Sequence, residues 1–231
     1  MSASAVFPAD LRTRRARYDL WLKETGPAVA PPVLGLEPDA TLSLDVAGLA
    51  ERGWDDLPLH WTPENGKVLH GGYGEDRAIY DAPAFRGAGE PRTLHLGLDI
   101  FASAGTEVFA PLDGCVHSLQ RNDNEKDYGP TLILQHETGT GFDLFTLYGH
   151  LAADVLSSLA PGDAVGEGQK LGELGDSHEN GGWAPHLHFQ VMLDLLGHSG
   201  DFPGVCRKSE ADLWLTLCPD PRPLLGLPPR S

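Results

Sequence analysis

Short runs typical of β-strands alternate with tight-turn residues throughout positions 93–193, and this pattern restricts the fold more than any other feature of the sequence. Glycine, proline and aspartate cluster between the runs, as at 111–114 and 161–163. The whole chain contains 28 glycines and 19 prolines, which favours many turns and short strands over long helices. We therefore predict an antiparallel β-sheet core with strands at 94–100, 107–110, 115–120, 131–136, 143–148, 170–174 and 186–193.

Helical patterns lie mostly outside these strands. Pro8 suits the first turn of a helix over 8–24, in which Tyr18 and Trp21 fall near one face. Shorter helices are predicted at 45–52, 152–159 and 209–217. The fold is thus expected to be mainly β with a minor α component. It divides into an N-terminal extension (1–92) that packs on the core, the core itself (93–195) and a C-terminal extension (196–231).

The charge of the chain excludes some classes of partner. Seventeen lysines and arginines face 33 aspartates and glutamates, for a net charge of −16, which argues against binding to nucleic acid or to an anionic lipid surface. No apolar run approaches the ~18 residues of a membrane-spanning helix, so we expect no integral membrane contact. The residues after Met1 lack the apolar stretch of a secretion signal, which predicts a cytoplasmic location, or a periplasmic or extracellular one if a leader has been removed. No pattern indicates an oligomeric state.

Two histidines share one face of the last predicted strand. His186 and His188 are two residues apart, so their side chains point the same way and their Cα atoms lie roughly 6.6 Å apart. Leu187 and Phe189 then face a core on the other side. The pair fits a metal or catalytic site, and the alternative is a pair of surface histidines on an exposed sheet face.

A third histidine and a carboxylate lie within the first predicted strand, 94–100. On a straight strand His95 and Asp99 share a face but lie roughly 13 Å apart, whereas a bend at Gly97 can bring them to one point. Two imidazoles and one carboxylate around an open fourth position form the ligand set of a catalytic zinc ion. His150, at the end of another predicted strand, is a further candidate for the same site.

Residues 93–193 resemble the lysostaphin-type (LytM-like) zinc metallopeptidase family. The matching motifs, in chain order, are His95-Leu-Gly-Leu-Asp99, Gly105-Thr-Glu-Val-Phe-Ala-Pro-Leu-Asp-Gly114, Tyr148-Gly-His-Leu151, Gly162-Asp-Ala-Val165, Gly168-Gln-Lys-Leu-Gly172 and Pro185-His-Leu-His-Phe189. The resemblance implies an antiparallel β-sheet of the lysostaphin type and hydrolysis of peptide bonds, usually in bacterial peptidoglycan.

The same resemblance assigns roles to individual residues. It implies that His95, Asp99 and His188 bind Zn²⁺ and that His150 and His186 are the catalytic histidines on the open side of the ion. Their ordinary pKa of ~6.5 suits both proton uptake and proton donation near neutral pH, and which of the two is the base stays open. The sequence departs from the family at Gln190, where glutamate is usual, and at 176–183, which would change the wall of the cleft.

Further residues are assigned to the surroundings of the ion. We expect His178, Trp183 and Tyr148 to line the substrate cleft. In some family members an upstream asparagine closes the open position at the zinc ion, and Asn65 is the candidate for such a plug. The alternative is that residues 1–92 serve as a scaffold that packs on the core.

Three functions fit these patterns. The first is a zinc endopeptidase acting on peptides, including peptidoglycan peptides. The second is a cytoplasmic zinc hydrolase of small amides or peptides, and the third is a non-catalytic binding module. The flanking segments, among them Gly71-Gly-Tyr-Gly-Glu-Asp-Arg77, are similar to the peptidase-like segment fused to class-III aminotransferases, which would place the second or third function beside amine metabolism. Retention of all five site residues favours catalysis.

Overall fold

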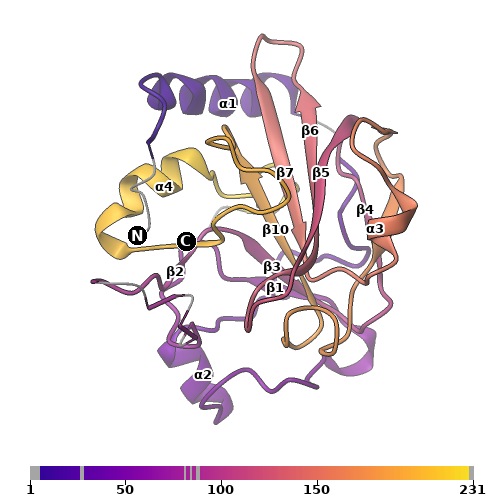
Figure 1. Ribbon diagram of the computed structural model, residues 1–231. Coiled ribbons are helices and arrows are strands. Elements are labelled where there is room, and N and C mark those ends of the chain that lie inside the picture. Colours follow the sequence, from indigo (N-terminus) through magenta and orange to yellow (C-terminus); the bar gives the residue numbers. More distant parts are fainter. Residues whose placement is uncertain (1–5, 27–28, 81, 84, 87–88, 229–231) are drawn as a thin grey trace.

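The computed structural model describes residues 6–26, 29–80, 82–83, 85–86 and 89–228. Its centre is a seven-stranded sheet in which every neighbouring pair of strands is antiparallel, in the order β1-β3-β10-β7-β6-β5-β8 (Figure 1). These strands are β1 (Leu69–Gly71), β3 (Leu98–Phe101), β5 (Gly114–Asn122), β6 (Gly129–Glu137), β7 (Asp143–Gly149), β8 (Ala164–Val165) and β10 (His186–Met192).

Two small sheets flank the main one. β2 (Leu94–His95) pairs with β11 (Val205–Cys206), and β4 (Glu107–Phe109) pairs with β9 (Lys170–Glu173). The helices are α1 (Leu11–Thr25), α2 (Val46–Arg52), α3 (Val155–Ser158) and α4 (Ala211–Leu217), with 3₁₀ turns η1 (Glu64–Gly66) and η2 (Lys208–Glu210). Among the described residues, no helix has the length and apolar character needed to cross a membrane.

The alternation of side chains along the strands separates two hydrophobic clusters. Leu187, Phe189 and Val191 of β10 point into the larger cluster, as the predicted pattern requires. Met192, on the other face of the same strand, points into a second cluster with Ile133 and Leu147. That second face of β10 also carries its polar residues, His186, His188 and Gln190. They lie next to the second cluster and are not part of it.

The N-terminal helix packs onto the sheet through one apolar side. Tyr18 and Trp21 are buried in the larger hydrophobic cluster, whereas Leu20 is 52% exposed. The helix ends at Gly26, whose left-handed backbone (φ 45°) lets its N–H bond to the carbonyl of Leu22. Arg15 donates to the carbonyl of Leu215, so α1 lies beside α4 and joins the two ends of the described chain (Figure 1).

The predicted fold class is confirmed as mainly antiparallel β with few helices. One predicted strand, 94–100, is divided into β2 and β3, which belong to different sheets. A Cβ atom at Gly97, between them, would lie 2.6 Å from the His188 ring, so only glycine lets the chain turn here against that histidine. The strands β1, β8 and β11 are too short for a recognisable alternation and were not predicted from the sequence.

A substitution in the sheet core tests this packing. Leu134 on β6 is fully buried, and its change to alanine removes buried methyl groups and leaves a cavity. We expect Leu134→Ala to lower the free energy of unfolding by about 2–5 kcal/mol in urea titrations. The matched change at the exposed Leu20 should cost about 0.5 kcal/mol or less, and equal effects at both positions would contradict the assignment of the core.

Candidate metal centre

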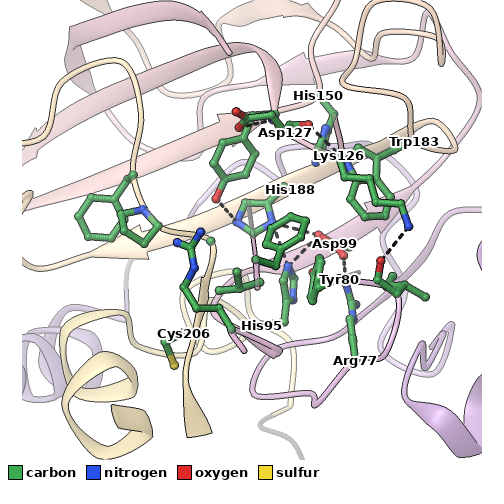
Figure 2. A pocket seen from close by; sticks show the side chains of 18 of the residues that line it. Arg77, Tyr80, His95, Asp99, Lys126, Asp127, His150, Trp183, His188 and Cys206 are labelled. Atoms are coloured by element: carbon green, nitrogen blue, oxygen red, sulfur yellow. Dashed lines mark hydrogen bonds and ion pairs between the residues drawn. The ribbon is translucent and has the colours of Figure 1, made fainter. Parts of the chain in front are cut away.

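Three side chains from β2, β3 and β10 converge on one point. His95 ends β2, and Asp99 and His188 are direct partners in the antiparallel pairing of β3 with β10. His95 Nε2 lies 2.9 Å from His188 Nδ1, and Asp99 Oδ1 lies 3.3 Å and 3.2 Å from these two nitrogens. Figure 2 shows Asp99 between Arg77 on one side and His188 on the other. The structure therefore brings together the three residues that the sequence assigned to the metal.

The outer nitrogens of both imidazoles are engaged by oxygen acceptors. His95 Nδ1 is 2.9 Å from the carbonyl oxygen of Gly72, and His188 Nε2 is 2.9 Å from Gln190 Oε1. The amide nitrogen Nε2 of Gln190 donates to the carbonyl of Pro203 at 3.2 Å. This contact fixes the amide so that its oxygen, Oε1, faces His188. A neutral imidazole carries one proton, so the proton of each ring lies on this outer side and the inner nitrogens present bare lone pairs.

This arrangement fits a metal cation. The carboxylate oxygen Asp99 Oδ1 is buried and has no hydrogen-bond partner among the described residues. Together with the two inner nitrogens it places three electron-pair donors, all within 4.8 Å of one another, around one point. Without a positive charge between them these donors would face one another at an energetic cost, and a divalent ion removes that cost.

The protonation states match those that metal binding requires. Burial lowers the pKa of His95 to about 4, and the opposing effect of the Asp99 carboxylate is smaller. Burial alone would raise the pKa of Asp99, but His95 and the Arg77 guanidinium outweigh it and hold this pKa well below its usual value. At neutral pH the His95 imidazole is therefore neutral and the Asp99 carboxylate is ionised, as metal ligands must be.

Two more histidines lie beside the cluster. His150 follows β7 with a left-handed backbone (φ 65°), and its Nδ1 donates to the carbonyl of Asn180 at 2.7 Å. His186 begins β10, and its Nδ1 donates to the carbonyl of Ala184 at 2.7 Å. The two ring centroids are 4.3 Å apart, and His186 Nε2 is 3.8 Å from Asp99 Oδ1. Burial lowers the pKa of both histidines, so each has a bare Nε2 that can accept a proton.

All five side chains line one cavity of about 710 Å³. Their exposed fractions are between 1% and 4%, so the site is largely removed from bulk water. Both flanking segments contribute to the walls. The lining includes Leu57 and Tyr80 from the N-terminal extension, and Phe202 and Trp214 from the C-terminal one.

The remaining predicted site residues have different positions. Trp183 lines the cavity, 6.2 Å from His150 between ring centroids. Tyr148 lies in the larger hydrophobic cluster, because it pairs with Phe189 of β10 and shares the core face of that residue. His178 is exposed in a loop, and Asn65 is exposed in η1; neither lines the described cavity. The structure thus does not bring Tyr148, His178 or Asn65 to the metal ligands.

Two lining residues were not singled out from the sequence. The hydroxyl of Tyr128 lies 3.4 Å from His188 Nε2, and Arg77 contacts Asp99 directly. Tyr128 precedes a predicted strand in a turn-rich stretch, where a single tyrosine carries no distinguishing pattern. Gln190, at which the sequence departs from the family pattern, contacts His188 Nε2 through its Oε1 and so holds the ring.

Two histidines and an aspartate from two antiparallel sheets converge on one buried point, and such a group could hold a single metal ion. Residues 93–198 match the sequence model of Peptidase family M23, and this segment contains all five side chains of the site. The segment 93–198 is therefore an M23 peptidase-type domain by its sequence. No curated protein matches the chain.

Several solved structures are similar to it. The catalytic domain of the antimicrobial peptidase lysostaphin from Staphylococcus simulans is 24% identical, over 63% of this chain and 90% of that one, with a TM-score of 0.41. A zinc-containing peptidase from Vibrio cholerae is 27% identical, over 43% of this chain and only 27% of that one, with a TM-score of 0.36. A putative M23 peptidase from Pseudomonas aeruginosa is 17% identical, over 99% of this chain and 67% of that one, with a TM-score of 0.41.

Removal of the carboxylate tests the metal centre. We expect the wild-type chain to retain one divalent ion per molecule after incubation with Zn²⁺ and dialysis, and Asp99→Ala to retain almost none, because the only anionic ligand is lost. Elemental analysis measures the metal content. Asp201→Ala, which removes a carboxylate from the wall of the same cavity, should leave the content unchanged. Equal metal content in wild type and Asp99→Ala would contradict the proposed ligand set.

Acid should destabilise the metal-free protein. His95, His150 and His186 have folded-state pKa values below the ordinary 6.5, so the unfolded state binds more protons as the pH falls below that value. The free energy of unfolding should therefore fall from about pH 6.5 towards pH 4, by up to about 1.4 kcal/mol per pH unit for each histidine that stays neutral. Urea titrations across this range measure the slope. His150→Gln should reduce it, and a stability independent of pH would contradict the buried neutral histidines.

Proposed function

We propose that this chain is a zinc-dependent peptidase that hydrolyses a peptide bond with a metal-activated water molecule. The observation that carries the proposal is the presence of two complementary sets of side chains in one buried cavity. One set consists of three converging electron-pair donors, and the other consists of two imidazoles with bare Nε2 atoms. A His₂Asp donor set with room for a further ligand is typical of catalytic zinc, whereas structural zinc sites are rich in cysteine.

The five side chains of the site have two different roles in hydrolysis, metal binding and proton transfer. His95, Asp99 and His188 would hold Zn²⁺, which would supply a Lewis acid able to lower the pKa of water and to polarise the scissile carbonyl. His150 and His186 are neutral at pH 7, so either Nε2 can accept a proton from the attacking water. The resulting imidazolium can then donate that proton to the amine leaving group.

The surroundings of the two histidines support this role. Their Nδ1–H groups are bound to the carbonyls of Asn180 and Ala184, which holds both rings in place and keeps Nε2 as the reactive atom. Since the walls keep bulk water from the site, charges and dipoles interact more strongly there than in solution. The same walls limit the number of water molecules that can compete for the proton.

The M23 domain and its motifs support peptides of the peptidoglycan type as the first substrates to test. A second candidate is a small soluble amide or peptide, and the burial of the site favours it. All five functional side chains are at most 4% exposed, and segments from both extensions wall the cavity. A small molecule enters such a cavity more readily than a cross-linked polymer.

Digestion experiments test both candidates. Zinc-loaded protein is incubated with intact cross-linked peptidoglycan and, separately, with soluble muropeptides, and the products are identified by mass spectrometry. We expect new peptide-bond products, and we expect His150→Ala to form them at least about 100-fold more slowly, because proton transfer contributes this much to hydrolysis. His117→Ala is the matched control, since His117 contacts Ser118 and Phe145 away from the cavity.

The outcomes separate the two candidates. Products from the polymer would support a peptidoglycan peptidase, and products from soluble fragments alone would support the small-substrate hydrolase. A zinc-loaded wild-type protein that cleaves neither substrate, nor a panel of simple dipeptides and amides, would contradict the proposed catalytic function.

A further inference from the structure

A segment of the N-terminal extension packs against the three candidate metal ligands, His95, Asp99 and His188. Residues 75–77 pair with β2, since the amide of His95 donates to the carbonyl of Glu75 at 2.9 Å and the amide of Arg77 donates to the carbonyl of Thr93 at 3.0 Å. This pairing places the side chains of Glu75 and Arg77, which are 3% and 2% exposed, beside Asp99. Two charged residues of the extension are thus fully buried next to a metal ligand.

Arg77 connects the two carboxylates. Its Nη1 donates to Asp99 Oδ2 at 2.5 Å and to the hydroxyl of Tyr80 at 3.1 Å, while its Nε donates to Glu75 Oε2 at 2.7 Å. Glu75 is itself held by the hydroxyl of Ser43 at 2.6 Å and the amide of Leu44 at 3.1 Å. The guanidinium therefore has a fixed position that depends on the extension.

The backbone leaves space for this arrangement. A Cβ atom at Gly72 would overlap Arg77 Nη2 and would lie 3.1 Å from His95 Nδ1. The carbonyl of the same glycine accepts the proton of His95 Nδ1. Gly72 thus allows the extension to approach both Arg77 and a metal ligand.

The two carboxylate oxygens of Asp99 have different contacts. Oδ2 is bound to Arg77, whereas Oδ1 faces His95 and His188 and has no hydrogen-bond partner among the residues described. A carboxylate free to rotate could offer either oxygen, or both, to a cation. We propose that Arg77 is a positioning residue of the metal centre, which holds Asp99 so that Oδ1 alone serves as ligand, and that Glu75 offsets the charge of Arg77. This inference rests on the zinc site of the proposed function.

Glu75 is required on electrostatic grounds. A guanidinium beside a metal ligand repels the cation that the ligand attracts. With Glu75 present, Asp99, Arg77 and Glu75 together carry one net negative charge, which still favours a cation. Residues 1–92, for which the sequence left a scaffold or an Asn65 plug as alternatives, would then act on the metal centre through Glu75 and Arg77.

A charge-conserving double variant separates position from charge. Glu75→Gln combined with Arg77→Met removes both buried charges, so the cluster keeps its one net negative charge on Asp99, but the contact to Oδ2 is lost. We expect this variant of the full chain to bind Zn²⁺ about tenfold or more weakly in competition with a chromophoric chelator, as is typical when an outer partner of a metal ligand is lost. The visible spectrum of the Co²⁺-substituted variant should also change, because Oδ2 becomes free to approach the metal.

Two further variants complete the experiment. Arg207→Met, the matched control elsewhere in the cavity wall, should leave both readouts unchanged, because Arg207 contacts Glu90 and Glu210 and not the three candidate ligands. If circular dichroism shows the double variant to be unfolded, Arg77→Lys takes its place. It keeps the charge, but a single ammonium nitrogen cannot reproduce the separate contacts of Nε to Glu75 and of Nη1 to Asp99, so we expect the same weaker binding and altered spectrum.

An affinity within about twofold of wild type, together with an unchanged Co²⁺ spectrum, would overturn the positioning role. Failure of the wild-type chain to bind zinc stoichiometrically would instead overturn the proposed zinc site, and this inference with it. The two failures are therefore distinguishable without measuring catalysis.

Discussion

The ionised carboxylate of Asp99 is buried between a guanidinium and two imidazoles, and much of the surrounding structure is needed to keep it there. An unpaired charge removed from water costs several kcal/mol, so the site requires a partner for each oxygen. Arg77 binds Oδ2, and Oδ1 is directed at the inner nitrogens of His95 and His188. The geometry leaves that second oxygen to a cation. Folding and metal binding are consequently coupled at this residue.

The antiparallel sheet supplies the rigidity that such a site needs. β3 and β10 are adjacent, and their pairing places Asp99 directly opposite His188. His95 comes from a separate two-stranded sheet, which the turn at Gly97 brings against the main one. The flanking segments are also part of the architecture, since β1 extends the main sheet beside β3 and β11 pairs with β2. The site is thus built from strands distant in sequence and walled by both ends of the chain.

Local patterns were sufficient to predict some of this architecture. Alternation and turn residues predicted the antiparallel core, and the spacing of His186 and His188 within one strand predicted their common face. The need for a bend at Gly97 could also be anticipated, because His95 and Asp99 cannot meet on a straight strand. Long-range pairing could not be read in this way. The contact between Arg77 and Asp99 depends on residues 75–77 lying beside β2, and strands of two or three residues leave no periodic signal. The position of Tyr148 in the core follows from its pairing with Phe189, and such a pairing between residues far apart in the sequence could not be predicted from local patterns.

The most direct test of the metal centre is an anomalous diffraction experiment at the zinc absorption edge on crystals of the zinc-loaded protein. We expect a single peak about 2.0–2.2 Å from His95 Nε2, His188 Nδ1 and Asp99 Oδ1, the distances typical of zinc bound to nitrogen and oxygen. We also expect Asp99 Oδ2 to remain bound to Arg77 and not to contact the ion. A peak at other side chains, or crystals of zinc-loaded protein without a peak between these three atoms, would contradict this metal site.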